Sequence, residues 1–282
     1  MTINQKLLNE LKVNPSKKLG QNFLVNNKIA KQIAQLVNAS NYQQIVEIGP
    51  GLGAITKQLD LSKKQYWGIE LDYRLFSYLL KLFTNNEKVS LINLDFLKFN
   101  SQDYFEQEGL LFGNIPYSIS TKIIKHFLAD TNLNEAILMV QKEYYQRLSA
   151  QVNTKDYNSL SVYVQTFCDL ELLITVSANN FHPIPKVDSV VFQLKKKTNC
   201  LVAKQALFGS FVKTCFQMKR KTLVNNIKPL FRTKEQMLVY LKQLKIDPNC
   251  RAETLDLLTF QQMFLTYDQN YHQYQRKKIS KR

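Results

Sequence analysis

Residues 44–54 read Gln-Ile-Val-Glu-Ile-Gly-Pro-Gly-Leu-Gly-Ala, a short apolar run that leads into three closely spaced glycines. The run predicts a buried strand, and the glycines predict a turn that opens a helix and lets the backbone approach a ligand. We expect Gly49 and Gly51 to contact that ligand. With Ala54 they also satisfy the G-x-G-x-x-A pattern of nicotinamide cofactors, so the motif alone leaves the ligand open.

Apolar runs and helix-length segments alternate along the first 195 residues. The other expected strands are Tyr66–Ile69, Val89–Leu94, Leu110–Phe112, Ala136–Val140, Glu171–Val176 and Ser189–Leu194. Helical patterns such as Tyr73–Phe83 lie between them. Short buried strands separated by helices predict an α/β fold with a parallel sheet that is covered on both faces.

After Lys197 the pattern becomes helical. Apolar residues share one face at Phe208, Phe211, Val212, Cys215 and Phe216, and a second helix is marked by Leu238, Leu241 and Leu244. Thr259–Gln262 has capping-box spacing for a third helix. We therefore expect an α/β domain over residues 1–197 and a small helical domain over residues 204–282.

The positive charge is concentrated in one part of the chain. Of the net charge of +16, residues 195–251 supply most, because they hold 14 Lys and Arg against two Asp and Glu. Residues 1–194 hold 19 against 17. A strongly basic block beside a near-neutral body indicates a polyanionic partner, nucleic acid before acidic protein, although a solvated face is the alternative.

Several classes of protein are disfavoured by composition. No apolar stretch approaches the roughly 20 residues of a membrane span, and the first residues lack the apolar region of a secretory leader. The cysteines at 168, 200, 215 and 250 form no CxxC, and only three histidines accompany them. We expect reduced cysteines, a cytoplasmic protein and no metal site.

Acidic residues end two of the expected strands. Glu70 follows Gly51 by 19 residues, and a carboxylate there can accept both ribose hydroxyls of an adenosine. Asp95 ends the next strand, where it can hold an adenine amino group. These positions predict a ligand that contains adenosine, and they fit NAD and S-adenosylmethionine equally.

The tetrapeptide Asn114-Ile-Pro-Tyr117 distinguishes these two ligands. The exocyclic amine of adenine is a poor nucleophile, because its lone pair is delocalised into the ring. The side-chain oxygen of Asn114 and the carbonyl of Ile115 or Pro116 can accept its two N–H bonds and stabilise the charge of a transition state. Tyr117 offers a ring face to the base. Hydride transfer has no use for this arrangement, so the motif favours methyl transfer from S-adenosylmethionine.

Five motifs in order make the chain resemble the rRNA adenine N6-dimethyltransferases. The resemblance is strongest to the KsgA type, which dimethylates two adjacent adenines in the 3′-terminal hairpin of small-subunit (16S) rRNA. The motifs are Lys18–Leu24, Glu47–Gly53, Asn114–Tyr117, Gln141–Glu143 with Arg147, and Phe181–Ser189.

The resemblance implies a Rossmann-like methyltransferase domain with a seven-stranded sheet, followed by a small C-terminal α-helical domain. The cofactor S-adenosylmethionine would contact Asn22, Leu24, Gly49, Glu70, Asp95 and Asn114. Tyr117 and Phe181 would lie against the target base. The expected partner is small-subunit rRNA or the pre-30S particle, and we expect a monomer that requires no metal and contacts no membrane.

Two other functions stay open. The erythromycin-resistance enzymes share most of these motifs but modify large-subunit (23S) rRNA, and some relatives bind nucleic acid as assembly or transcription factors without needing methylation. Phe216–Leu223 and Arg251–Leu255 resemble elements of the small-subunit type and favour it. Three residues depart from the family pattern: Ser118, Asn158 and Lys219.

We expect residues 204–251 to dock RNA while catalysis stays in the first domain. Lys219, Arg220 and Lys221 are consecutive, so on a helix they would fan over about 200° and could not all face a core. The other expected RNA contacts are Lys17, Lys18, Arg147 and Arg251.

Overall fold

A computed structural model describes residues 8, 10–11, 13–16 and 20–274, and these residues form two compact units. The first unit comprises residues up to 145 together with residues 169–196, and the second comprises residues 146–168 and 197 onward. The boundary near residue 197 agrees with the sequence. Residues 146–168, which the sequence assigned to the first domain, fall in the second unit because helix α6 (Ser159–Phe167) packs against helices of that unit.

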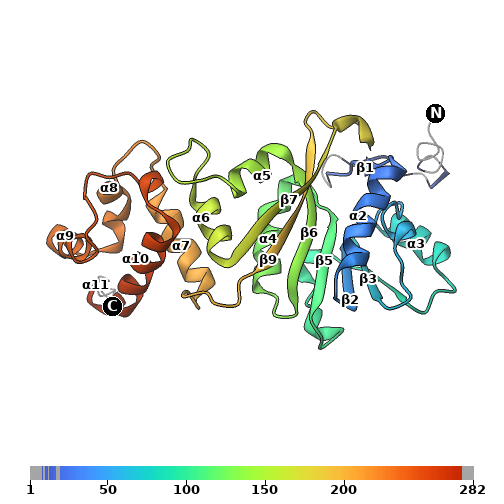
Figure 1. The fold of residues 1–282 in the computed structure, drawn as a ribbon, viewed down its shortest axis with the longest axis horizontal. Helices are drawn as coiled ribbons and strands as arrows, with labels where there is room; N and C mark the ends of the chain where they lie inside the picture. The colour runs from blue at the N-terminus through green and yellow to red at the C-terminus, as the bar shows by residue number, and fades with distance from the viewer. Residues whose placement is uncertain (1–7, 9, 12, 17–19, 275–282) are drawn as a thin grey trace, which may run out of the picture. The chain divides into compact units, whose positions relative to one another are not determined.

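A seven-stranded sheet forms the centre of the first unit, in the order β4-β3-β2-β5-β6-β9-β7 (Figure 1). Its strands are β2 (Gln44–Ile48), β3 (Gln65–Glu70), β4 (Val89–Asn93), β5 (Gly109–Asn114), β6 (Leu133–Gln141), β7 (Cys168–Val176) and β9 (Ser189–Lys196). The neighbours from β4 to β6 are parallel, and β9 is antiparallel to β6. The predicted α/β methyltransferase fold is confirmed.

Helices bury both faces of this sheet. Helix α2 (Asn27–Ala39) packs Ile33 and Val37 into a core with Ile45 and Phe112. Residues that alternate with these along the strands, such as Leu111, are fully buried as well, as period-two strands covered on two sides require. Helix α3 (Tyr73–Leu82) packs against β3 and β4, α4 (Ser120–Ala129) packs against β6, and α5 spans Lys142–Leu148.

A second sheet of two short strands joins distant parts of the first unit. β1 (Phe23–Leu24) pairs antiparallel with β8 (Phe181–His182), and Leu24 lies opposite Phe181. The chain before the main sheet is thereby tied to the connection between β7 and β9.

The second unit is helical. Besides α6 it contains α7 (Gln205–Cys215), α8 (Leu223–Ile227), α9 (Lys234–Gln243), α10 (Leu257–Gln269) and α11 (Tyr271–Tyr274). The predicted apolar face of α7 is buried at Phe208, Phe211, Val212 and Cys215. In the described part of the chain, no helix has the length and apolar character to cross a membrane.

Two predictions about these helices were wrong in detail. Helix α9 buries Met237, Tyr240 and Leu241, whereas Leu238 is exposed, because the i, i+3, i+4 face is set by the neighbouring helices rather than by leucines alone. Helix α10 begins earlier than predicted. The side chain of Asp256 accepts a hydrogen bond from the backbone N–H of Thr259, so Asp256 is the cap and Thr259 lies inside the helix.

Candidate functional site

A cavity of about 350 Å³ opens at the carboxyl ends of β2, β3 and β5. The sheet order reverses between β2 and β5, and open parallel sheets bind ligands at such a switch point. All residues that line the cavity belong to the first unit. The predicted cofactor residues among them are Asn22, Leu24, Gly49, Gly51, Glu70, Asp95 and Asn114.

The glycine-rich turn after β2 forms one wall of the cavity. Gly49 and Gly51 have φ of +58° and +61°, in the region that glycine tolerates best. A side chain at Gly51 would meet the ring of Phe23 at 3.3 Å. The predicted helix does not start here, because successive left-handed residues cannot enter a right-handed helix. The chain instead makes a short 3-10 helix at Thr56–Gln58.

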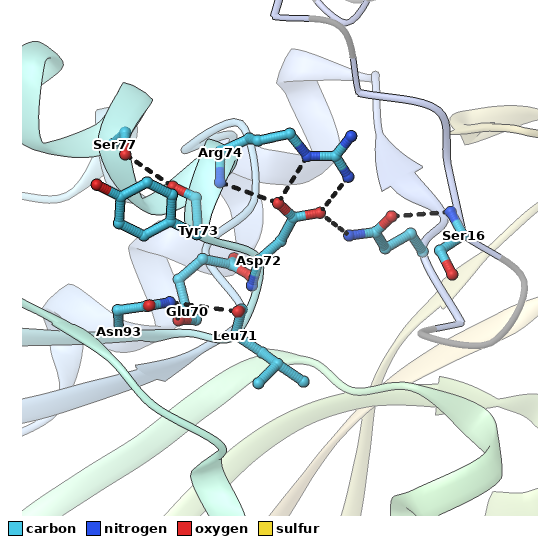
Figure 2. Close-up of polar contacts among 9 residues, drawn as sticks. Ser16, Glu70, Leu71, Asp72, Tyr73, Arg74, Ser77 and Asn93 are labelled. Carbon is cyan, nitrogen blue, oxygen red and sulfur yellow. Dashed lines mark hydrogen bonds and ion pairs between the residues drawn. The ribbon is translucent and has the colours of Figure 1, made fainter.

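Glu70 presents a buried carboxylate at the end of β3. Its Oε2 accepts a hydrogen bond from the backbone N–H of Gly51 at 3.0 Å, and its Oε1 accepts one from that of Asp72 at 2.9 Å. Burial raises the pKa of Glu70, while these two backbone bonds oppose the rise. Figure 2 shows Asn93, at the end of β4, whose side-chain amide donates to the carbonyl of Glu70 at 2.8 Å.

Glu47 is a second carboxyl group at the cavity, and the sequence analysis did not single it out. Its Oε2 accepts hydrogen bonds from Thr56 Oγ1 at 2.6 Å and Tyr66 Oη at 2.8 Å. Complete burial raises its pKa to about 7, against the effect of these two bonds. An acidic residue inside an otherwise apolar strand was the signal available in the sequence.

Asp95 and the residues after it form the wall next to β4. The side chain of Asp95 accepts a hydrogen bond from the backbone N–H of Leu97 at 3.0 Å and caps a 3-10 helix at Phe96–Lys98. One carboxylate oxygen is thus held by the protein, while the side chain remains partly exposed at the cavity. This placement agrees with a group that meets a ligand.

The Asn-x-Pro-Tyr motif follows β5 and contacts the N-terminal segment. The side-chain nitrogen of Asn114 donates to the carbonyl of Asn22 at 2.9 Å, which leaves the side-chain oxygen of Asn114 as an acceptor. The carbonyl of Pro116 already accepts hydrogen bonds from Ile119 N at 3.2 Å and Ser120 Oγ at 3.1 Å. Of the two carbonyls that the sequence left open, these bonds favour that of Ile115.

The two predicted base contacts, Tyr117 and Phe181, are not among the described residues that line the cavity. Tyr117 is half-buried next to Pro116, and its hydroxyl lies 3.1 Å from Ser189 Oγ. Burial raises the pKa of this hydroxyl. Phe181 is only 1% exposed and belongs to the core packed beneath α2. The structure therefore brings the cofactor residues together with Asn114 and Pro116, but it does not bring Phe181 to them.

Charge in the cavity is predominantly acidic. Glu47, Glu70 and Asp95 line it, and among the described lining residues the one cation is Lys122. Such a lining suits a ligand with positive charge better than the pyrophosphate of a nicotinamide cofactor, for which positive or helix N-terminal groups are typical.

The predicted RNA contacts of the second unit are exposed. Lys219, Arg220 and Lys221 lie in a turn after α7, so the helix predicted there is wrong. All three side chains still face solvent, because a turn between α7 and α8 offers no core to enter. Arg147 and Arg251 are also exposed, and Arg251 lies 3.7 Å from Glu253. Lys17 and Lys18 lie outside the described residues.

Asn158 and Ser118 depart from the family pattern, and the structure gives each a place. Asn158 caps α6: its side chain accepts from the backbone N–H of Leu160 at 2.8 Å, and its own N–H donates to Ser161 Oγ. Ser118 is exposed and lines the cavity beside Pro116.

Comparisons with known proteins agree with this geometry. The profile of the family described as ribosomal RNA adenine dimethylase matches residues 13–269. Proteins named ribosomal RNA small subunit methyltransferase A are 41% identical in Mycoplasma genitalium, over 86% of this chain and 92% of that protein, and 38% identical in Ureaplasma parvum, over 89% and 92%.

Solved structures show the same fold. A dimethyladenosine transferase from Plasmodium falciparum superposes with a TM-score of 0.77 at 27% identity, covering 88% of this chain and 98% of that one. The 23S rRNA methyltransferase ErmE gives a TM-score of 0.65 at 22% identity, covering 88% and 100%, and that likeness concerns the fold alone.

Proposed function

The chain belongs to the ribosomal RNA adenine dimethylase family, and we propose that it transfers methyl groups from S-adenosylmethionine to N6 of two adjacent adenines in the 3′-terminal hairpin of 16S rRNA. The observation that carries the proposal is the pairing of an acidic cavity at the switch point with Asn114, whose side-chain oxygen is left as an acceptor. The small-subunit target rests on the names of the relatives and on the two C-terminal elements.

The residues present fit the cofactor. Glu70 would hold the ribose hydroxyls, Asp95 the adenine amino group, and Gly49 and Gly51 leave the backbone accessible. Asn22, Leu24 and Asn114 supply the remaining wall. When bound, S-adenosylmethionine supplies an electrophilic methyl group on a cationic sulfonium, and the acidic lining favours a cation.

The acceptor residues act on the amine of the target adenine. Asn114 Oδ1 and the carbonyl of Ile115 accept its two N–H bonds, which favours tetrahedral geometry at nitrogen and stabilises the charge that develops there. Tyr117 stacks against the extruded base. Direct displacement requires neither a metal nor a covalent enzyme intermediate. We propose that the protein acts as a monomer on the pre-30S particle in the cytoplasm.

The exposed basic residues of the second unit are proposed to bind rRNA phosphates. Such contacts set affinity and register, and they carry little sequence information. The choice of adenines therefore comes from the fit of the RNA hairpin as well as from the cavity.

The test is primer extension across both rRNAs after incubation of unmethylated ribosomal particles with the purified protein and S-adenosylmethionine. We expect stops at two adjacent adenines near the 3′ end of 16S rRNA, and none with Glu70→Ala at limiting cofactor, since that change should raise Kd about tenfold. A stop in 23S rRNA would identify a resistance-type enzyme. Binding to the particles without any stop would identify a non-catalytic factor.

A further inference from the structure

The side-chain amide of Gln21 joins the N-terminal segment to the turn that follows β3. Its oxygen accepts a hydrogen bond from the backbone N–H of Ser16 at 2.8 Å, and its nitrogen donates to Asp72 Oδ2 at 3.4 Å. Figure 2 shows Ser16 and Asp72 at the two ends of this link. Both ends of the amide therefore have partners within the protein.

Asp72 is a fixed acceptor for this link. It is 8% exposed, its Oδ1 accepts from the backbone N–H of Arg74 at 3.0 Å, and the guanidinium of Arg74 contacts both carboxylate oxygens. The hydrogen bond from the Arg74 side chain lowers the pKa of Asp72, so this group is an anion. The backbone N–H of Asp72 donates to Glu70 Oε1, which places Gln21 one residue away from the ribose-binding carboxylate.

The neighbours of Gln21 in the chain contact the other side of the cavity. An added Cβ at Gly20 would meet the Cβ of Pro116 at 3.0 Å, and the carbonyl of Asn22 accepts the hydrogen bond from Asn114. Residues 20–22 thus contact the acceptor motif through the flanking residues and the turn after β3 through Gln21.

We propose that Gln21 is a positioning residue, which keeps the ribose-binding turn at Glu70 in register with the acceptor residues at Asn114 by linking the N-terminal segment to Asp72. The inference rests on the proposed function. Because Gln21 acts through Asp72, its loss should weaken cofactor binding and leave the chemistry of the amine intact.

The experiment uses Gln21→Glu in the full chain. The new carboxylate still accepts from Ser16, but it places a negative charge against Asp72 in place of a donor. We expect Kd and KM for S-adenosylmethionine to rise about tenfold, with kcat at saturating cofactor changed by less than about twofold. Gln107→Glu is the matched control, because Gln107 pairs with Gln44 at the opposite end of the sheet.

A second variant separates positioning from damage to the fold. Gln21→Glu combined with Asp72→Asn restores a donor opposite an acceptor, and we expect it to recover most of the lost affinity, whereas Asp72→Asn alone should not bind better than wild type. Unchanged affinity in Gln21→Glu, or no recovery in the double variant, would overturn the inference. Wild-type protein that fails to bind S-adenosylmethionine by calorimetry would overturn the proposed function and this inference with it.

Discussion

The cavity in the first unit and the basic stretch in the second use charge in opposite ways. In the cavity, Glu47 and Glu70 are almost completely buried, and each is held by two hydrogen bonds of known donor. In the basic stretch, Lys219, Arg220 and Lys221 are exposed in a turn. A few fixed charges can select a ligand and act on it, whereas many solvated charges attract any polyanion. Variants should therefore separate catalysis from docking.

The largest effect is expected at Asn114. Asn114→Ala removes the side-chain oxygen that accepts from the target amine, and the rate at saturating cofactor should fall about 10²–10³-fold, as for other preorganised transition-state groups. Methylation of unmethylated particles with labelled cofactor measures it. Asn132→Ala is the matched control, since Asn132 also donates to a backbone carbonyl, that of Phe105 at 2.7 Å, outside the cavity. Equal losses in both variants would assign Asn114 to folding alone.

Glu47 should make stability depend on pH. Burial raises its pKa from 4.5 to about 7, so between these values the folded protein retains a proton that the unfolded chain has released. Wild-type stability should therefore fall as the pH rises through this window. Glu47→Gln cannot ionise, and its free energy of unfolding relative to wild type should increase by about 3 kcal/mol between pH 4.5 and 8, at 1.36 kcal/mol per pKa unit. Urea unfolding without cofactor measures the difference, and parallel pH curves would contradict the buried carboxyl.

Much of the fold was visible in the sequence because strands are local patterns. The expected strand at residues 44–48 matches β2 residue for residue, and the other expected strands all lie in the sheet. The carboxylates at strand ends were predictable for the same reason. Parallel strands carry their last residues to one edge, so Glu70 and Asp95 had to meet the glycine-rich turn there.

The features that the sequence did not reveal depend on contacts between distant residues. Glu47 owes its buried role to Tyr66, which a strand pairing brings beside it. Phe181 looked like a base contact, but the pairing of β8 with β1 places it in the core. The helix predicted at Lys219–Lys221 was wrong because apolar periodicity ends at Phe216 and gives no signal for a turn.

Charge reversal in the basic stretch should weaken docking without touching the cavity. Lys219, Arg220 and Lys221 changed together to Glu should lower affinity for the rRNA particle about 100-fold at 0.1 M salt, since each lost phosphate contact reduces the log–log salt slope by about 0.7–0.9. Cofactor affinity should be unchanged. Filter binding at several salt concentrations measures the slope.

The matched control reverses the same amount of charge elsewhere. Lys28, Lys31 and Lys63 are exposed lysines of the first unit, and their replacement by Glu should affect docking less. If both triple variants lose affinity equally, net charge rather than the turn after α7 governs binding.

The smallest effect is expected where the structure separates Tyr117 from Phe181. Tyr117→Ala should lower the methylation rate about tenfold, because base–aromatic stacking contributes about 1–3 kcal/mol per base. Tyr117→Phe keeps the ring and loses only the contact with Ser189, so it should remain close to wild type. Phe181→Leu changes a core residue that is 1% exposed, and it should lower the free energy of unfolding more than the rate at temperatures well below the melting point. Rates and melting temperatures of the three variants, measured side by side, decide between the two rings. A rate for Phe181→Leu as low as that of Tyr117→Ala would mean that Phe181 leaves the core to meet the base.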